Sequence, residues 1–179
     1  MPESPGDFAG EPDAFGRLWT PHRMVYIKGE SKPESDEEHE CPFCTAPSKS
    51  DEDALIVARG DLVYAVLNLY PYNSGHLMTV PYRHVADYPD LSTDELTELG
   101  TFTQQAMTAL HAAMGPHGFN LGINQGNVAG AGIAAHLHQH VVPRWGGDTN
   151  FMPIVARTRV LPELLSQARV ALADAWPTS

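Results

Sequence analysis

His136-Leu-His-Gln-His140 is the stretch of sequence that decides the fold, because it places an imidazole at every second residue. Side chains alternate between the two faces of a β-strand, so this spacing predicts a strand with all three rings on one face. The outer rings then lie about 13 Å apart, at about 3.3 Å per residue, and one metal ion cannot bind all three. The pattern favours a division of roles: one neutral imidazole attacks phosphorus, a second binds phosphate, and the third binds a metal or orients its neighbours. A plain core strand and a metal site of two histidines are the alternatives.

Turn residues and apolar periodicity around the histidines predict the rest of the fold. The glycine-rich loop over 124–132 precedes the histidine strand, and its backbone N–H groups can approach an anion without interference from a Cβ. Ser92-Thr-Asp-Glu95 is a capping box that predicts a helix ending at Gly115, and a last helix is expected to begin near Pro162. Runs rich in β-formers predict five strands, at 55–59, 62–67, 76–80, 119–123 and 138–142, the last of them ended by Pro143. We therefore expect an α+β domain with an antiparallel five-stranded sheet and two main helices.

Length, charge and hydropathy limit the classes of protein. The 179 residues contain 22 Asp and Glu against 11 Lys and Arg, a net charge of −11, which argues against non-specific nucleic-acid binding. No run of about 18 apolar residues is present, so no membrane helix is expected. The acidic N-terminus lacks the basic and apolar regions of a signal peptide. We therefore expect a cytoplasmic protein with a disordered tail over 1–16 and a single domain over 17–179.

Both cysteines of the chain fall in Cys41-Pro-Phe-Cys44, and three interpretations compete for this pair. A disulfide is disfavoured in a cytoplasmic protein. A redox dithiol is disfavoured because the acidic residues that precede the pair would raise a thiol pKa rather than lower it. Zinc is the third interpretation, and a closed tetrahedral site needs two further ligands.

The chain resembles the histidine triad (HIT) superfamily, because His136 to Val142 matches the family pattern His-x-His-x-His-x-x. Further stretches that carry the resemblance are Val66–Leu77, Val80-Pro81, Asn124–Gly126, Leu18–Ile27 and Val141–Asp148. The first two are similar to the family's nucleotide-binding strands and turn, and the third is similar to its phosphate loop. The last two are most similar to the branch that holds diadenosine tetraphosphate phosphorylases and hydrolases. The resemblance covers about residues 41–150, and it implies a HIT-like fold and a homodimer.

The resemblance also implies roles for matched residues. The middle histidine, His138, would attack the α-phosphorus of a nucleotide and form a nucleotidyl-histidine, with His140 as a hydrogen-bond donor to phosphate and His76 in the same catalytic group. Zinc in related proteins is held by a Cys-x-x-Cys pair, a histidine after the strand-ending proline and the first triad histidine. The matching residues are Cys41, Cys44, His84 and His136, with His39 as a spare candidate. Such a zinc would be structural and would fix where His138 points.

Four further positions are expected to contact the substrate. Asn68 would hold the ribose hydroxyls and Asn124 the phosphate. Gly132 stands where many family members have Gln or Ser, so any contact there is made by the backbone or through water. Trp145 would stack on a base or line a dimer interface, and simple packing is the alternative.

The resemblance implies an enzyme that cleaves dinucleoside polyphosphates, either a diadenosine tetraphosphate phosphorylase or a hydrolase. A nucleoside phosphoramidase, a uridylyltransferase-like enzyme and a nucleotide-binding module without turnover are the alternatives. The acidic residues cluster in 30–53 and 87–98, whereas Arg144 lies beside the histidines. The net charge of −11 therefore does not conflict with a polyanionic substrate, because the local potential at the site counts and not the total charge.

Overall fold

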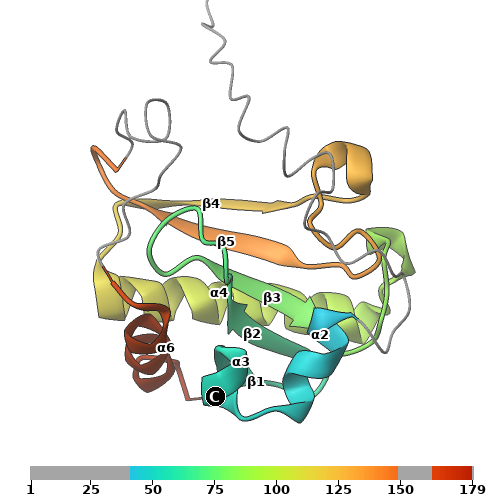
Figure 1. Cartoon of the computed structure of the whole chain (residues 1–179), viewed down its shortest axis with the longest axis horizontal. Coiled ribbons are helices and arrows are strands. Elements are labelled where there is room, and N and C mark those ends of the chain that lie inside the picture. Colours follow the sequence, from blue (N-terminus) through green and yellow to red (C-terminus); the bar gives the residue numbers. More distant parts are fainter. Residues whose placement is uncertain (1–40, 149–162, 179) are drawn as a thin grey trace, which may run out of the picture.

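A five-stranded antiparallel sheet forms the centre of the computed structural model, which describes residues 41–148 and 163–178 (Figure 1). The strands lie in the order β1-β2-β3-β5-β4, and every neighbouring pair is antiparallel. Their bounds are β1 Ile56–Arg59, β2 Val63–Leu67, β3 Leu77–Pro81, β4 Gly118–Ile123 and β5 Gln139–Arg144. The helices are α2 Pro42–Thr45, α3 Asp51–Ala54, α4 Thr93–Met114 and α6 Leu165–Asp174, with 3-10 turns at Ala46–Ser48, Tyr88–Asp90 and Asn127–Ala129. The predicted fold class, with a five-stranded antiparallel sheet and two main helices, is confirmed, and α2 and α3 are one-turn additions.

The capping box forms as predicted and fixes the start of α4. The Ser92 hydroxyl accepts the backbone N–H of Glu95 at 3.2 Å, and the Glu95 carboxylate accepts the backbone N–H of Ser92 at 2.7 Å. The helix ends at Gly115, whose φ of 57° lies in the left-handed region that glycine adopts without strain. α4 therefore spans the same residues that the sequence pattern predicted.

The two faces of the sheet have different partners, because the side chains of each strand alternate. On one face, β2, β3 and β5 pack against α4, and α6 contacts α4 and β1. The opposite face carries α2, and Phe43 packs there against Tyr64, Met78 and Val80. His140 shares this second face, because its neighbours Gln139 and Val141 lie on the α4 side. The sheet therefore separates a helical layer from a layer that contains the histidines.

The histidine strand is shorter than its spacing predicts. β5 begins at Gln139, so His140 lies on a strand, whereas His136 and His138 lie in the irregular chain before it. The reason is a contact with a distant segment: the Leu137 backbone N–H donates at 2.7 Å to the carbonyl of Val85, which lies in a loop and not in a paired strand. His136 and His138 therefore lie outside the regular strand, contrary to the prediction. Their rings nevertheless share the face of His140, because both contact Phe43 and the intervening Leu137 packs on the α4 side.

β5 also continues through Pro143 to Arg144, although a stop at Pro143 was expected. Phe119 pairs with Pro143, and Gly118 pairs with Arg144. The pairing of β3 with β5 runs only from Thr79 to Leu77, opposite Gln139 to Val141. Among the described strands, β4 is therefore the partner of β5 at Pro143, and an edge of this kind tolerates a residue without an N–H.

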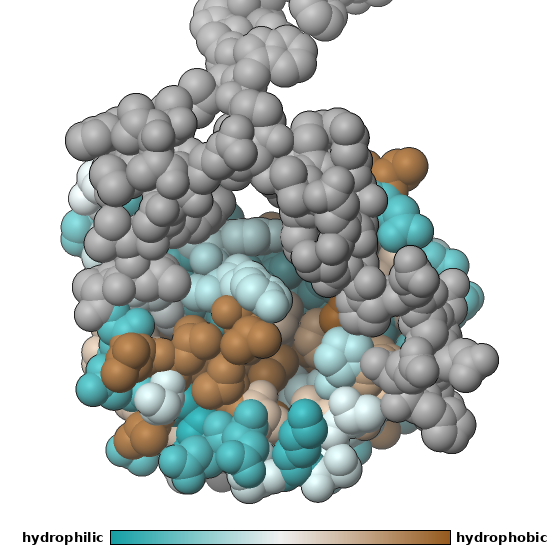
Figure 2. All heavy atoms as spheres, in the orientation of Figure 1, coloured by the Kyte–Doolittle hydropathy of each residue, from teal (hydrophilic) through white to brown (hydrophobic). Residues whose placement is uncertain are grey.

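Some expectations fall on residues that the structure does not describe. The disordered tail over 1–16, the first residues of the single domain and the helix start near Pro162 lie outside the described residues. Within 41–148 and 163–178, no helix combines the length and the apolar character needed to cross a lipid bilayer. Hydrophobic side chains gather on the surface over α6 (Figure 2), where Leu164 and Val170 are among the exposed apolar residues.

Candidate active site and metal centre

Four side chains from three separate segments meet beside α2 and form a candidate metal centre. Cys41 precedes α2, Cys44 lies within it, His84 follows β3 and His136 precedes β5. Their ligand atoms all lie within 4.8 Å of one another. Cys41 Sγ and Cys44 Sγ are each 3.4 Å from His136 Nδ1, and Cys44 Sγ is 3.2 Å from His84 Nδ1. The structure thus confirms that these four residues are placed to bind a metal; His39 lies outside the described residues.

The chemical state of His136 suits a metal ligand. Its Nε2 lies 2.9 Å from the Pro81 carbonyl oxygen, and a carbonyl can only accept, so Nε2 carries the proton. Burial lowers the pKa of the ring to about 4, which keeps it neutral. The lone pair is therefore on Nδ1, the atom that faces the two thiols. Two cysteines and two histidines are a donor set typical of zinc, and within the described chain the cysteines are not joined in a disulfide.

His138 follows two residues later, and its ring is held in one tautomer. It is buried, at 5% exposure, and burial lowers its pKa. Nδ1 lies 2.8 Å from the His136 carbonyl oxygen and must therefore donate its proton there. The neutral ring then has its lone pair on Nε2. A neutral, oriented imidazole of this kind is a nucleophile.

His76 and His140 form a second pair with assigned protons. The Tyr72 backbone N–H donates to His76 Nδ1 at 3.0 Å, so the proton of the neutral His76 ring is on Nε2. That Nε2 lies 2.9 Å from His140 Nδ1 and donates to it. The proton of His140 is therefore on Nε2, because burial lowers the pKa of His140 to about 4 and keeps the ring neutral. His140 can donate one hydrogen bond to a bound group from this atom.

Among the three catalytic candidates, His140 contacts both of the others. The ring centroids of His138 and His140 are 5.0 Å apart, as are those of His76 and His140. A lone pair on His138 and an N–H donor on His140 thus lie on neighbouring rings, an arrangement that suits attack on a phosphorus whose oxygens are hydrogen-bonded. A cavity of about 360 Å³ adjoins His140 and is lined also by Tyr72, Asn120 and Asn124. The structure therefore brings Asn124 to the same opening as His140.

The chain is similar in sequence to known proteins. The HIT domain model matches residues 49–147, more than half of the chain. The chain belongs to the HIT family. It is 51% identical over 170 residues to AP-4-A phosphorylase from Mycobacterium tuberculosis, covering 93% of this chain and 87% of that protein.

Two further proteins are similar to this chain. The bis(5'-nucleosyl)-tetraphosphatase (asymmetrical) of Schizosaccharomyces pombe is 32% identical over 101 residues, which cover 56% of this chain and 55% of that protein. The crystal structure of a Zn-bound histidine triad family protein from Mycobacterium smegmatis superposes with a TM-score of 0.63 at 23% identity, covering 78% of this chain and 94% of that chain. This likeness supports the HIT fold.

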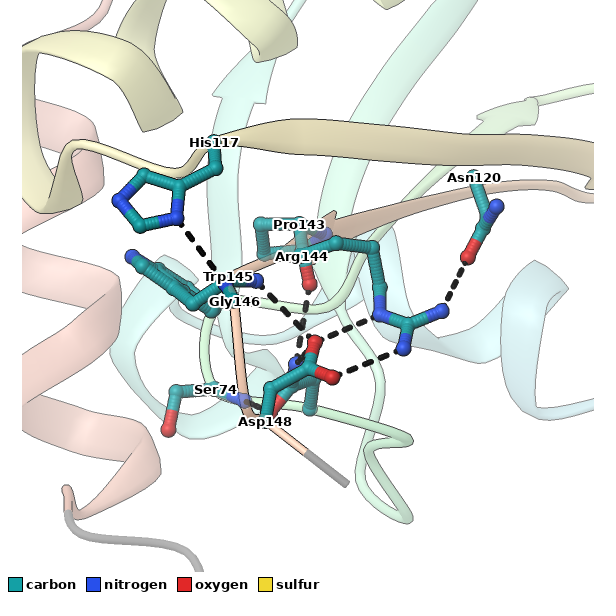
Figure 3. Close-up of polar contacts among 9 residues, drawn as sticks. Ser74, His117, Asn120, Pro143, Arg144, Trp145, Gly146 and Asp148 are labelled. Carbon is teal, nitrogen blue, oxygen red and sulfur yellow. Dashed lines mark hydrogen bonds and ion pairs between the residues drawn. The ribbon is translucent and has the colours of Figure 1, made fainter.

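An ion pair at the end of β5 in this HIT domain was not foreseen from the sequence (Figure 3). Arg144 Nε and Nη2 donate to the two carboxylate oxygens of Asp148 at 2.6 and 2.8 Å, and Nη1 donates to Asn120 Oδ1 at 2.6 Å. The Asn73 amide donates to the same carboxylate at 2.9 Å. The Arg144 guanidinium, as the largest cause, lowers the pKa of Asp148 to about 2. Arg144 does lie beside the histidines as expected, but Asp148 compensates its charge.

The remaining predicted contact residues of the HIT domain occupy different places. Asn68 Oδ1 accepts the Tyr70 backbone N–H at 2.9 Å, and its Nδ2 lies 3.4 Å from His76 Nδ1, so this side chain shapes the turn before β3. Gly132 is half-buried in the loop before the triad. Trp145 is half-buried, and its ring points away from the Arg144 side chain (Figure 3) and is not part of the cavity wall beside His140. Their substrate contacts stay predictions.

Proposed function

We propose that the protein is a nucleotidyl-transferring enzyme that cleaves dinucleoside polyphosphates, with diadenosine tetraphosphate as substrate and inorganic phosphate as acceptor. The observation that carries the proposal is the fixed tautomer of His138, whose Nε2 lone pair lies beside the His140 N–H. The 51% identity to AP-4-A phosphorylase, over almost the whole chain, supports this substrate.

The first step forms a bond between His138 Nε2 and the α-phosphorus. The bond from that phosphorus to its bridging oxygen breaks, and the polyphosphate part leaves with the electron pair. The ring becomes a positively charged nucleotidyl-imidazole, and the hydrogen bond from its Nδ1–H to the His136 carbonyl, 2.8 Å long, stabilises that charge. The His140 N–H donates to a non-bridging oxygen, where negative charge develops.

In the second step, an acceptor takes the nucleotidyl group from His138. An oxygen of inorganic phosphate attacks the same phosphorus, the bond to His138 Nε2 breaks, and the lone pair returns to the ring. With diadenosine tetraphosphate the products are ATP from the first step and ADP from the second. Water in place of phosphate gives AMP, which is the outcome for a hydrolase.

Substrate contacts complete the proposal. Asn124 lines the cavity beside His140 and is proposed to bind phosphate. Asn68 is proposed to bind the ribose, Gly132 to offer its backbone N–H, and Trp145 to stack on a base.

A homodimer and a cytoplasmic location are further proposals, and light scattering of the purified protein tests the dimer.

We propose that Cys41, Cys44, His84 and His136 hold a structural zinc ion. The support is the donor set and the His136 Nδ1 lone pair that faces both thiols. Bound zinc would link α2 and the end of β3 to the chain just before His138, and so help to orient the nucleophile. Elemental analysis of protein purified without chelator should find about one zinc per chain. Protein without zinc would refute this proposal.

Product analysis tests the activity directly. Diadenosine tetraphosphate is incubated with the protein, with and without inorganic phosphate, and the nucleotides are separated by chromatography. ATP and ADP that appear only with phosphate support a phosphorylase, whereas AMP and ATP in both samples support a hydrolase, the activity named for the S. pombe relative. His138→Ala should abolish either reaction, and His111→Ala, an exposed histidine, is the control. Full turnover by His138→Ala would refute the mechanism.

No cleavage in either sample would favour the alternative substrates, nucleoside phosphoramidates and other nucleotide conjugates. Nucleotide binding without cleavage of any of these compounds would favour a non-catalytic module.

A further inference from the structure

The layer between β5 and α4 contains a small polar cluster around the Gln139 amide. Gln139 lies between His138 and His140 in sequence, and its side chain points to the opposite face of the sheet from the His140 ring. Its amide Nε2 donates to the Thr103 hydroxyl at 2.8 Å, and Thr103 is buried in α4. The Thr103 hydroxyl donates in turn to the Leu99 carbonyl at 2.7 Å.

A second threonine extends this contact to the next strand. Thr79, which is fully buried, pairs directly with Gln139 across β3 and β5, and its hydroxyl is 3.4 Å from that of Thr103. The proton of Thr103 is used for the Leu99 carbonyl, so its oxygen accepts from the other two groups. One hydroxyl of α4 thereby joins two neighbouring strands to the helix.

Gln139 is also the first residue of β5 that pairs with the two neighbouring strands, β3 and β4. Thr79 opposite Gln139 is the first pair of β5 with β3, and Ile123 opposite Gln139 is the last pair of β4 with β5. The chain before it, with His138 and the metal-site residue His136, is irregular. The position of Gln139 therefore sets where the irregular chain leaves the sheet, and a slip of one residue would move His140 to the α4 face.

We propose that Gln139 and Thr103 are positioning residues, whose hydrogen bond across the sheet fixes the place of His138 and His140 for nucleotidyl transfer. Neither side chain lines the cavity beside His140, and both act through the backbone of β5. The inference rests on the proposed function, because turnover is its readout. It predicts that losing the hydrogen bond slows the chemical step and leaves substrate binding nearly unchanged, since a small misplacement of a reacting group affects the rate strongly.

The test compares kcat and KM for phosphorolysis of diadenosine tetraphosphate in single and double variants. Gln139→Leu and Thr103→Val should each lower kcat by about 10-fold to 100-fold, with KM within about twofold of the wild type. Thr103→Ser keeps the hydroxyl and should restore kcat to within about twofold. The double variant should be no slower than the slower single variant, because both changes remove the same bond.

Thr108→Val is the matched control, because Thr108 lies on the same helix and its exposed hydroxyl donates to the carbonyl four residues before it, as that of Thr103 does. It should keep the wild-type kcat. If Gln139→Leu fails to fold, as judged by thermal unfolding, the comparison of Thr103→Val with Thr103→Ser decides the question.

Three results would overturn the inference: a folded Gln139→Leu or Thr103→Val with wild-type kcat, equal losses in Thr103→Ser and Thr103→Val, or losses that multiply in the double variant. A wild-type protein without turnover would instead refute the proposed function, so the two failures are distinguishable.

Discussion

Replacing His76 with leucine tests the pairing of the catalytic histidines. His76 is fully buried, and its ring contacts those of Tyr72 and His140, at centroid distances of 4.6 and 5.0 Å. Leucine has a similar volume, so the change removes hydrogen-bonding groups and leaves only a small cavity. His140 Nδ1 loses its donor and the Tyr72 backbone N–H loses its acceptor.

The expected loss of rate follows from the tautomer of His140. Without a donor at Nδ1, the proton of the neutral ring can move to that atom, and Nε2 then presents a lone pair to the phosphate instead of an N–H. A buried hydrogen bond of this kind is worth about 1–3 kcal/mol, and the loss of that amount from the transition state lowers kcat by about 5-fold to 150-fold. Loss of the hydrogen bond from the Tyr72 N–H to His76 adds a stability cost of about 1 kcal/mol.

Steady-state phosphorolysis of diadenosine tetraphosphate measures the first effect, and thermal unfolding measures the second. His76→Gln is the matched control, because its amide has both a donor for His140 and an acceptor for the Tyr72 N–H. It should be faster than His76→Leu. A folded His76→Leu with the kcat of the wild type would show that His140 does not need this donor, and equal rates of the two variants would refute the role of the hydrogen bond.

Three further predictions concern the metal, pH and charge. A chelator should lower the melting temperature of the wild type but not that of Cys44→Ser, as measured by calorimetry; equal shifts would contradict a zinc ligand at Cys44. The Arg83 side chain, as the largest cause, lowers the pKa of Glu95 from 4.5 to about 2, so this carboxylate stabilises the fold above about pH 5 and the contribution is lost as the pH falls through 2. The melting temperature of the wild type should thus fall more steeply than that of Glu95→Gln between pH 5 and pH 2, and parallel curves would contradict the linkage. Asp148→Asn leaves the Arg144 charge uncompensated and should lower KM for the anionic substrate by about twofold to fivefold at low salt, an effect that added salt removes; an unchanged KM would show that this charge does not reach the substrate.

Patterns of residues close in sequence predicted most of the helices and strands. The histidine motif, through the family that it resembles, predicted the residues of the candidate site. The capping box Ser92 to Glu95 and the glycine at 115 define α4 because caps depend on residues close in sequence. The five strands were found to within one or two residues from their apolar runs and turns. The motif around His136 identified the HIT family, and its resemblance led to Cys41, Cys44 and His84, which the structure brings together.

Contacts between distant segments decided what the local rules could not. The alternation rule correctly placed the three rings on one face. It also placed them on one strand, whereas Leu137 bonds to Val85 and the first two histidines precede the regular strand. The charge of Arg144 looked available until Asp148 was seen to pair with it. Burial likewise set the neutral state of His140, because the cost of removing a charge from water depends on all the chain packed around it.

The positions of the protons on the histidine rings separate most clearly what the sequence determined from what the tertiary structure decided. The sequence by itself determined that histidines at 136, 138 and 140 belong together and that phosphate chemistry suits them. Only the tertiary structure decided which nitrogen of each ring is a donor. The Tyr72 N–H, the Pro81 carbonyl and the second ring come from other segments, and the His136 carbonyl faces the His138 ring only in the folded chain. A tautomer is fixed by the hydrogen bonds of its surroundings, and those surroundings exist only once the chain has folded.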